Sequence, residues 1–162
     1  MEQRTLGRTG RTVSVIGLGT WQLGADWGDV SEIEARAVLD ASHGAGVTIF
    51  GTADVYGDGR SETIIGGWRA ELSDPERGEI TVATKMGRRF EQLAENYSAE
   101  NFRFWTDRSR RNLGMDTLDL VQLHCPPTAV YEDDRTYDAL DALVGSGAIA
   151  VSAWSHVSTL TP

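Results

Sequence analysis

Short apolar runs alternate along this chain with amphipathic stretches at a regular pitch, and this alternation constrains the fold more than any other feature. The apolar runs predict buried strands at residues 47–50, 80–85, 118–124 and 148–154. The stretches around them predict helices at about 31–42, 61–72, 98–113 and 137–144. Continuous apolar strands that alternate with helices are typical of a parallel sheet covered by helices. No linker or low-complexity segment divides the sequence, so we expect a single domain over residues 1–162.

Local signals refine this prediction. Ser31 and Glu34 have the spacing of a capping box at the start of the first helix. Residues 4–16 predict a short N-terminal β-hairpin, and residues 15–21 predict a buried strand that runs into a glycine-containing loop. The pair at 74–75 predicts a loop. The chain therefore supplies a hairpin and about four and a half βα units, because the sequence stops about where a fifth helix would begin.

Charge and cysteine content narrow the class of protein. The formal net charge of −9 argues against a nucleic-acid partner and against an anionic membrane surface. The longest apolar runs have the length of a strand, so we expect no membrane span, and the N-terminus leads to no apolar signal core. A single cysteine, Cys125, cannot form an internal disulfide. A reducing cytoplasmic location is therefore expected.

Three chemistry-bearing side chains fall at the ends of successive strands. Tyr56 follows the strand at 47–50, Lys85 ends the next strand, and His124 ends the one after. The carboxyl ends of parallel strands share one face of an α/β fold, so these side chains should converge. A lysine ammonium beside a tyrosine lowers the pKa of the phenol, which makes the tyrosine a better proton donor. Alternatively, Tyr56 is an ordinary loop aromatic, Lys85 is a solvated charge at a strand end, and His124 is a buried core histidine.

Other motifs do not support a site of their own. Gly17 and Gly19 begin like a dinucleotide fingerprint, but Gln22 occupies the place of its third glycine. Gly57 and Gly59 lack the Lys-Ser/Thr ending of a phosphate loop. No His or Cys spacing suggests zinc, so no metal site is expected.

Several motifs together resemble those of the aldo-keto reductase family. They are Gly17-Leu18-Gly19-Thr20-Trp21, the stretch from Thr52-Ala53 to Ser61-Glu62, Ala83-Thr84-Lys85, and the segment from Leu113-Gly114 to Leu123-His124. The resemblance covers essentially the whole chain. It implies a TIM-type (β/α)₈ barrel with a nicotinamide cofactor, usually NADPH, that reduces aldehydes and ketones. Such a barrel needs about 250 residues, so this chain would be a truncated barrel, the N-terminal half to two-thirds.

The resemblance also assigns catalytic roles. The family's tyrosine, which donates the proton, falls on Tyr56, its lysine on Lys85 and its histidine on His124. Its aspartate falls on Gly51, so a carboxylate beside the lysine is missing at this catalytic position. Asp54 lies three residues further on and is a doubtful replacement.

The remaining site residues follow from the resemblance alone. Gly19, Thr20 and Ser155 are expected to contact the cofactor, and Trp21 is expected to line the pocket for a small carbonyl substrate.

These observations predict a carbonyl reductase impaired by Gly51 and by the absence of the later strands, on which the resemblance places the contacts to the cofactor's phosphates and adenosine. Two alternatives stay open. One is an inactive half-barrel that associates into a homodimer through exposed sheet edges. The other is a binding module that kept the scaffold and lost the chemistry.

Overall fold

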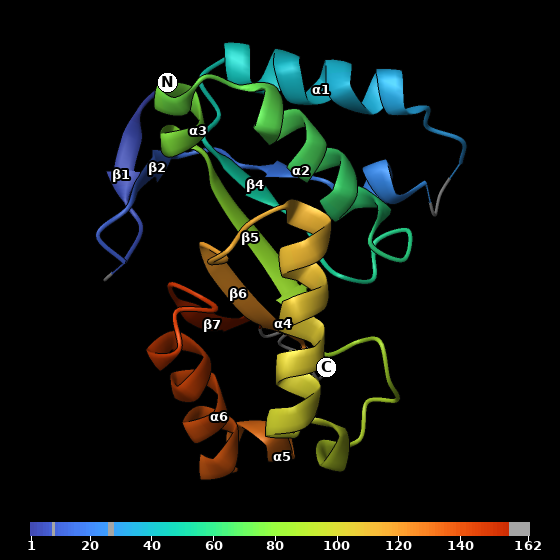
Figure 1. Cartoon of the computed structure of the whole chain (residues 1–162), viewed down its shortest axis with the longest axis vertical. Helices are drawn as coiled ribbons and strands as arrows, with labels where there is room; N and C mark the ends of the chain where they lie inside the picture. The colour runs from blue at the N-terminus through green and yellow to red at the C-terminus, as the bar shows by residue number, and fades with distance from the viewer. Residues whose placement is uncertain (8, 26–27, 156–162) are drawn as a thin grey trace, which may run out of the picture.

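A parallel sheet is the centre of the molecule. The computed structural model describes residues 1–7, 9–25 and 28–155, with side chains up to residue 153. Five strands pair in chain order, all parallel: β3 (Leu18–Gly19), β4 (Ile49–Gly51), β5 (Thr81–Met86), β6 (Leu120–His124) and β7 (Ser152–Ser155) (Figure 1). A separate antiparallel hairpin precedes them, formed by β1 (Gln3–Thr5) and β2 (Thr12–Ser14). The predicted α/β fold with an N-terminal hairpin is therefore confirmed.

Four main helices follow the strands and pack against one another in chain order. They are α1 (Glu32–Gly44), α2 (Arg60–Glu71), α4 (Ala99–Leu113) and α6 (Asp134–Gly145) (Figure 1). Shorter helices lie in the connections: η1 (Trp21–Gly24), α3 (Asp74–Glu79), η2 (Ala94–Asn96) and α5 (Thr128–Tyr131). Strands in chain order with a helix after each of β3 to β6 are the arrangement of part of a (β/α) barrel. Among the described residues, none of the helices is long and apolar enough to span a bilayer.

The ends of the helices show which local predictions were right. The capping box at α1 is present, since the Ser31 hydroxyl accepts from the Glu34 amide at 3.2 Å and Glu34 accepts from the Ser31 amide at 2.9 Å. The predicted loop at 74–75 is wrong, because α3 occupies it. A second capping box between Ser73 and Glu76 starts α3, and Pro75 lies in the first turn, where a missing N–H costs nothing.

The last strand begins later than predicted. β7 starts at Ser152, and Ile149 forms only an isolated bridge with Leu118. Both of these apolar side chains are 1% exposed. The apolar run before Ser152 is therefore buried in the core, but it does not form a continuous strand with β6.

The core lies between the sheet and the helices. Its largest fully buried side chains include Trp105, Phe50, Phe102, Leu39 and Ile65. Close packing of α2 on α4 depends on a glycine, since a Cβ at Gly66 would lie 2.7 Å from the carbonyl oxygen of Asn112.

A partly buried ion pair ties the hairpin to the sheet. Arg11 Nη2 lies 2.6 Å from Asp119 Oδ1, and the other oxygen of Asp119 accepts from the Val82 amide at 2.9 Å. Asp119 directly precedes β6, so this contact holds the hairpin at the amino ends of the strands. The carboxyl ends, where the polar side chains were predicted to meet, lie at the opposite edge of the sheet.

Candidate active site

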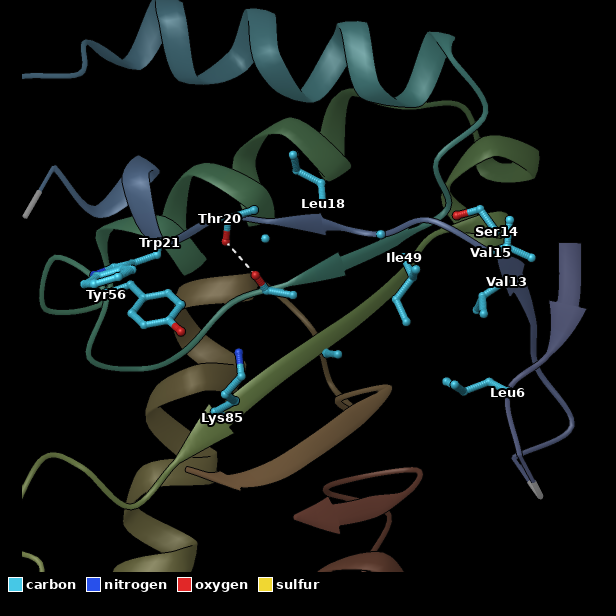
Figure 2. Close-up of a pocket in the computed structure, with 14 residues that line it drawn as sticks. Leu6, Val13, Ser14, Val15, Leu18, Thr20, Trp21, Ile49, Tyr56 and Lys85 are labelled. Atoms are coloured by element: carbon cyan, nitrogen blue, oxygen red, sulfur yellow. Dashed lines mark hydrogen bonds between the residues drawn. The ribbon is translucent and has the colours of Figure 1, made fainter. Parts of the chain in front are cut away.

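The three predicted side chains meet at the carboxyl ends of the strands. Lys85 lies near the end of β5 and His124 ends β6, while Tyr56 comes from the loop after β4. The Lys85 ammonium is 5.3 Å from the centre of the Tyr56 ring. The rings of Tyr56 and His124 are 5.9 Å apart and meet edge to face. Figure 2 shows the Lys85 ammonium and the Tyr56 hydroxyl pointing toward one another.

Two hollows open around this cluster and share Trp21 and Tyr56. The first, about 440 Å³, runs along the inner side of β3, β4 and β5, and its lining includes Gly19, Gly51 and Lys85 (Figure 2). The second, about 520 Å³, is lined by Trp21, Val55, Tyr56, Arg88 and His124. Trp21 is 42% exposed, and its ring lies 6.2 Å from that of Tyr56, so it forms a wall of both hollows.

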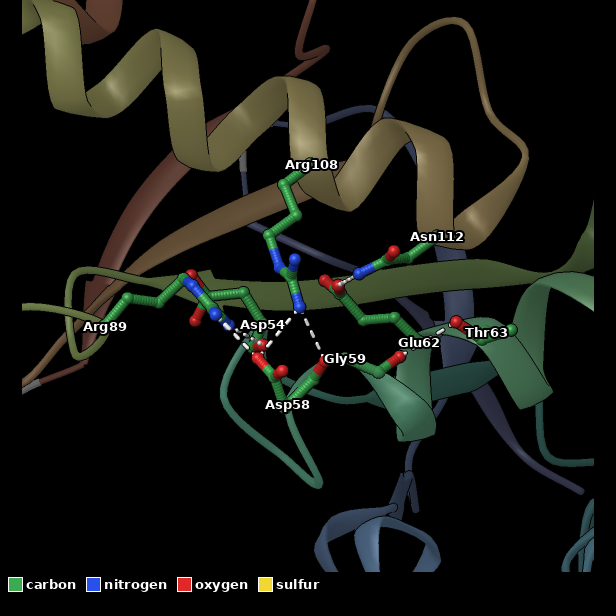
Figure 3. Close-up of polar contacts among 8 residues, drawn as sticks. All are labelled: Asp54, Asp58, Gly59, Glu62, Thr63, Arg89, Arg108 and Asn112. Carbon is green, nitrogen blue, oxygen red and sulfur yellow. Dashed lines mark hydrogen bonds and ion pairs between the residues drawn. The ribbon is translucent and has the colours of Figure 1, made fainter.

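The loop that carries Tyr56 is held from behind. Gly57 has a φ of +58°, and a Cβ there would overlap the carbonyl oxygen of Gly24, so this position requires glycine. Asp58 pairs with Arg89 at 2.6 Å and with Arg108 at 2.8 Å (Figure 3). These contacts hold the loop against α4 and against the segment that follows β5, and they restrict the position of the Tyr56 ring.

Lys85 has no carboxylate partner among the described residues. Its ammonium donates to the backbone oxygen of Thr52 at 2.8 Å instead. Burial lowers the pKa of Lys85 below its usual value, because no nearby carboxylate offsets the loss of water. Burial likewise raises the pKa of Tyr56, and the positive charge of Arg88 opposes that rise. Tyr56 is therefore protonated at neutral pH and able to act as an acid.

Nothing in the backbone at Gly51 requires a glycine. A Cβ there would meet only the carbonyl oxygen of Leu18, at an ordinary 3.8 Å, and its φ lies outside the left-handed region. Its carbonyl oxygen accepts from the Thr20 amide at 2.9 Å and from the Thr20 hydroxyl at 3.0 Å. The position has room for a larger side chain that would face the first hollow.

Asp54 does not replace the missing partner of Lys85. Its side chain is fully buried, and its carboxylate oxygens make no hydrogen bond to any residue that the structure describes. Burial and the neighbouring Glu62 raise the pKa of Asp54 to about 7, while Arg89 and Arg108 act in the opposite direction (Figure 3). The charges that act on Asp54 are therefore those of Glu62, Arg89 and Arg108, and Lys85 is not among them.

His124 is neutral at pH 7. Burial, together with the positive charges of Lys85 and Arg88, lowers its pKa to about 4. Its Nδ1 atom is buried without a hydrogen-bond partner among the described residues. A buried N–H without an acceptor is costly, so the proton is favoured on Nε2. The ring can then donate one hydrogen bond but cannot supply a proton as an imidazolium.

The predicted cofactor contacts have different surroundings. Gly19 and Thr20 line the first hollow, although the Thr20 hydroxyl is already bonded to Gly51 and lies 2.8 Å from the Ser61 hydroxyl. The backbone of Ser155 pairs with His124 in the β6–β7 register, and its side chain lies outside the described residues. In the described part of the chain, no three His, Cys, Asp or Glu side chains gather as a metal site.

Sequence reasoning missed Arg88. This exposed residue follows β5, and its Nε donates to the carbonyl oxygen of His124 at 3.1 Å. The sequence signal that could have identified Arg88 is its position three residues after Lys85, just past the end of the same strand.

Taken together, the fold and the site define a (β/α)-barrel type of protein with a tyrosine, a lysine and a histidine gathered at the carboxyl ends of its strands. The profile of the aldo/keto reductase family matches residues 15–160, and the chain belongs to this family. It is 35% identical to an L-galactose dehydrogenase of Arabidopsis thaliana over 144 residues, which covers 89% of this chain and 41% of that protein.

Solved structures agree with this assignment. The aldo-keto reductase AKR11C1 from Bacillus halodurans superposes with a TM-score of 0.81 at 31% identity, over 97% of this chain and 51% of that one. An aldo/keto reductase from Klebsiella pneumoniae, solved in complex with NADP and acetate, superposes with a TM-score of 0.75 at 26% identity, over 93% and 48% of the two chains. The chain spans about half the length of the relatives it matches.

Proposed function

We propose that this chain carries the proton-donating site of an NADPH-dependent reductase of aldehydes or ketones. The observation that carries the proposal is the meeting of Tyr56, Lys85 and His124 where two hollows adjoin, with Lys85 lining the first, His124 the second and Tyr56 both. Membership of the aldo/keto reductase family and the NADP complex of the Klebsiella pneumoniae relative support a nicotinamide cofactor.

The first hollow suits a flat ring. Its floor is made partly of glycines, and a Cβ at Gly19 would have no neighbour within 4 Å. We assign the backbone of Gly19, Thr20 and Ser155 to cofactor contacts, since the Thr20 hydroxyl already has partners. When bound, the nicotinamide supplies a hydride for the carbonyl carbon.

The side chains then divide the remaining work. The Tyr56 hydroxyl donates its proton to the carbonyl oxygen, and general acid catalysis of this kind contributes about 10²–10⁴-fold. The Lys85 ammonium stabilises the phenolate that remains. Neutral His124 donates a hydrogen bond that orients the carbonyl, and Trp21 forms the wall against which the substrate packs.

Gly51 weakens this arrangement without removing it. Lys85 lacks the carboxylate that would keep it charged and hold it in place, and a backbone carbonyl is a poorer partner. We therefore propose an impaired reductase. The sequence contains one cysteine, Cys125, so no internal disulfide can form, which fits the proposed reducing, cytoplasmic location.

The first step of the test measures NADPH binding by fluorescence titration on size-fractionated protein. The second step measures NADPH oxidation in the presence of an aromatic aldehyde. We expect Tyr56→Phe to bind NADPH as the unchanged protein does and to lose about 10²-fold or more in turnover. Equal turnover by the two proteins would contradict the role of Tyr56.

The same sample tests the two alternatives. Binding without turnover would favour a non-catalytic binding module. We also propose that β3 and β7, the outer strands of the sheet among the described residues, allow two copies to associate. Sedimentation that shows a compact monomer would contradict this association.

A further inference from the structure

We propose that the carbonyl substrate is an anion, a short oxo acid or a formyl carboxylate, and that Arg88 binds its carboxylate. The inference rests on the proposed reductase function and specifies the substrate class of that site.

The position of Arg88 is the first observation. It lines the second hollow together with Tyr56, His124 and Trp21. Its Nε is tied to the carbonyl oxygen of His124 at 3.1 Å, which orients the guanidinium. Its two terminal nitrogens make no hydrogen bond or ion pair with the residues that the structure describes. A guanidinium presented in this way can bind a carboxylate with two parallel hydrogen bonds.

A comparison with neighbouring arginines gives the second observation. Arg89 and Arg108 both pair with Asp58, at 2.6 and 2.8 Å. Arg88 has no ion pair within the described part of the chain, although it follows the same strand as Arg89. Of these three arginines, the one that faces the cavity has no ion pair in the described part of the chain, while the other two share the carboxylate of Asp58.

The charge balance of the cavity is the third observation. Lys85 and Arg88 line the two hollows, and no Asp or Glu does so among the described residues. Gly51 occupies the place in the lining where an acidic side chain would offset Lys85. The protein as a whole carries a net charge of −9, so this positive cavity is a local exception. A substrate carboxylate would supply the missing negative charge.

The size of the hollow limits the substrate. A volume of about 520 Å³ lies in the range of small-molecule pockets. A carbonyl at Tyr56 and His124 and a carboxylate at Arg88 must then belong to one small molecule. Trp21 and Val55 give that molecule apolar walls.

A matched pair of probes tests the inference: 4-formylbenzoate and its uncharged methyl ester, titrated calorimetrically into the protein without NADPH. We expect the acid to bind about tenfold or more tightly than the ester, as a charge-assisted hydrogen bond allows. Arg88→Gln should remove this preference and leave ester binding unchanged. Arg88→Lys keeps the positive charge but loses the paired N–H donors of the guanidinium, so it should retain part of the preference for the acid. Arg103→Gln removes an exposed arginine of α4 and should bind as the unchanged protein does.

Three results would overturn the inference: equal binding of acid and ester, a preference that survives in Arg88→Gln, or no binding of either probe. NADPH-dependent turnover of the ester tests the reductase proposal separately, because the ester has no carboxylate for Arg88. Acid preference without ester turnover would therefore count against the reductase and not against the anion site.

Discussion

Restoring a carboxylate at position 51 is the sharpest test of how this site works. Gly51 and Lys85 lie on adjacent parallel strands and line the same hollow. A Cβ at Gly51 meets only the Leu18 carbonyl at 3.8 Å, so Gly51→Asp is sterically allowed. The new carboxylate should raise the pKa of Lys85, which burial now lowers.

The size of the effect follows from two opposing terms. Two unit charges about 4 Å apart attract by about 4 kcal/mol at an effective dielectric constant of about 20. Removing the new carboxylate from water offsets much of this gain. A remainder of about 1.5–3 kcal/mol, available to the transition state, corresponds to about 10–10² in turnover.

The assay is NADPH-dependent reduction of an uncharged aromatic aldehyde by Gly51→Asp, with Gly51→Asn as the matched uncharged control. We expect the aspartate variant to be faster than both the unchanged protein and the asparagine variant. Thermal unfolding of all three proteins shows whether the fold is kept. Equal rates for the aspartate and asparagine variants would refute the reasoning, because charge would then not matter at this position.

Two other substitutions test the support behind the loop. Because the native pKa of Asp54 is about 7 instead of its ordinary 3.8, the native state holds this proton more tightly, and stability should fall as pH rises from about 4 to 7. Between pH 5 and pH 8, the two conditions at which urea unfolding is measured, this loss amounts to about 3 kcal/mol, and Asp54→Asn should remove it. An unchanged pH dependence would contradict the assignment. Gly57→Ala should destabilise by about 2 kcal/mol or more and lower NADPH-dependent turnover, because it strains the backbone and overlaps Gly24. Gly78→Ala, at an exposed helical position with open space, should be neutral or slightly stabilising, and similar unfolding curves for the two alanine variants would argue against a rigid loop.

Local sequence signals predicted the elements well where the interactions that form them are also local. The hydroxyl of Ser31 and the carboxylate of Glu34 cap α1 across three residues, and Gly114 ends α4 in the left-handed conformation. The same rule applies to α3, where Ser73 and Glu76 repeat the spacing, although the adjacent Pro75 by itself favours a loop.

By itself, the sequence determined the alternation of strands and helices, and with it the edge at which Tyr56, Lys85 and His124 meet. Parallel strands bring their carboxyl ends together whatever the loops do, so strand order was enough. Only the tertiary structure decided the charges around that edge. Asp54 lies close to Tyr56 in sequence, yet its carboxyl is influenced by groups behind the loop, and Arg88 faces the cavity while Arg89 does not. The direction of a loop side chain depends on contacts with distant elements, which no short stretch of sequence contains.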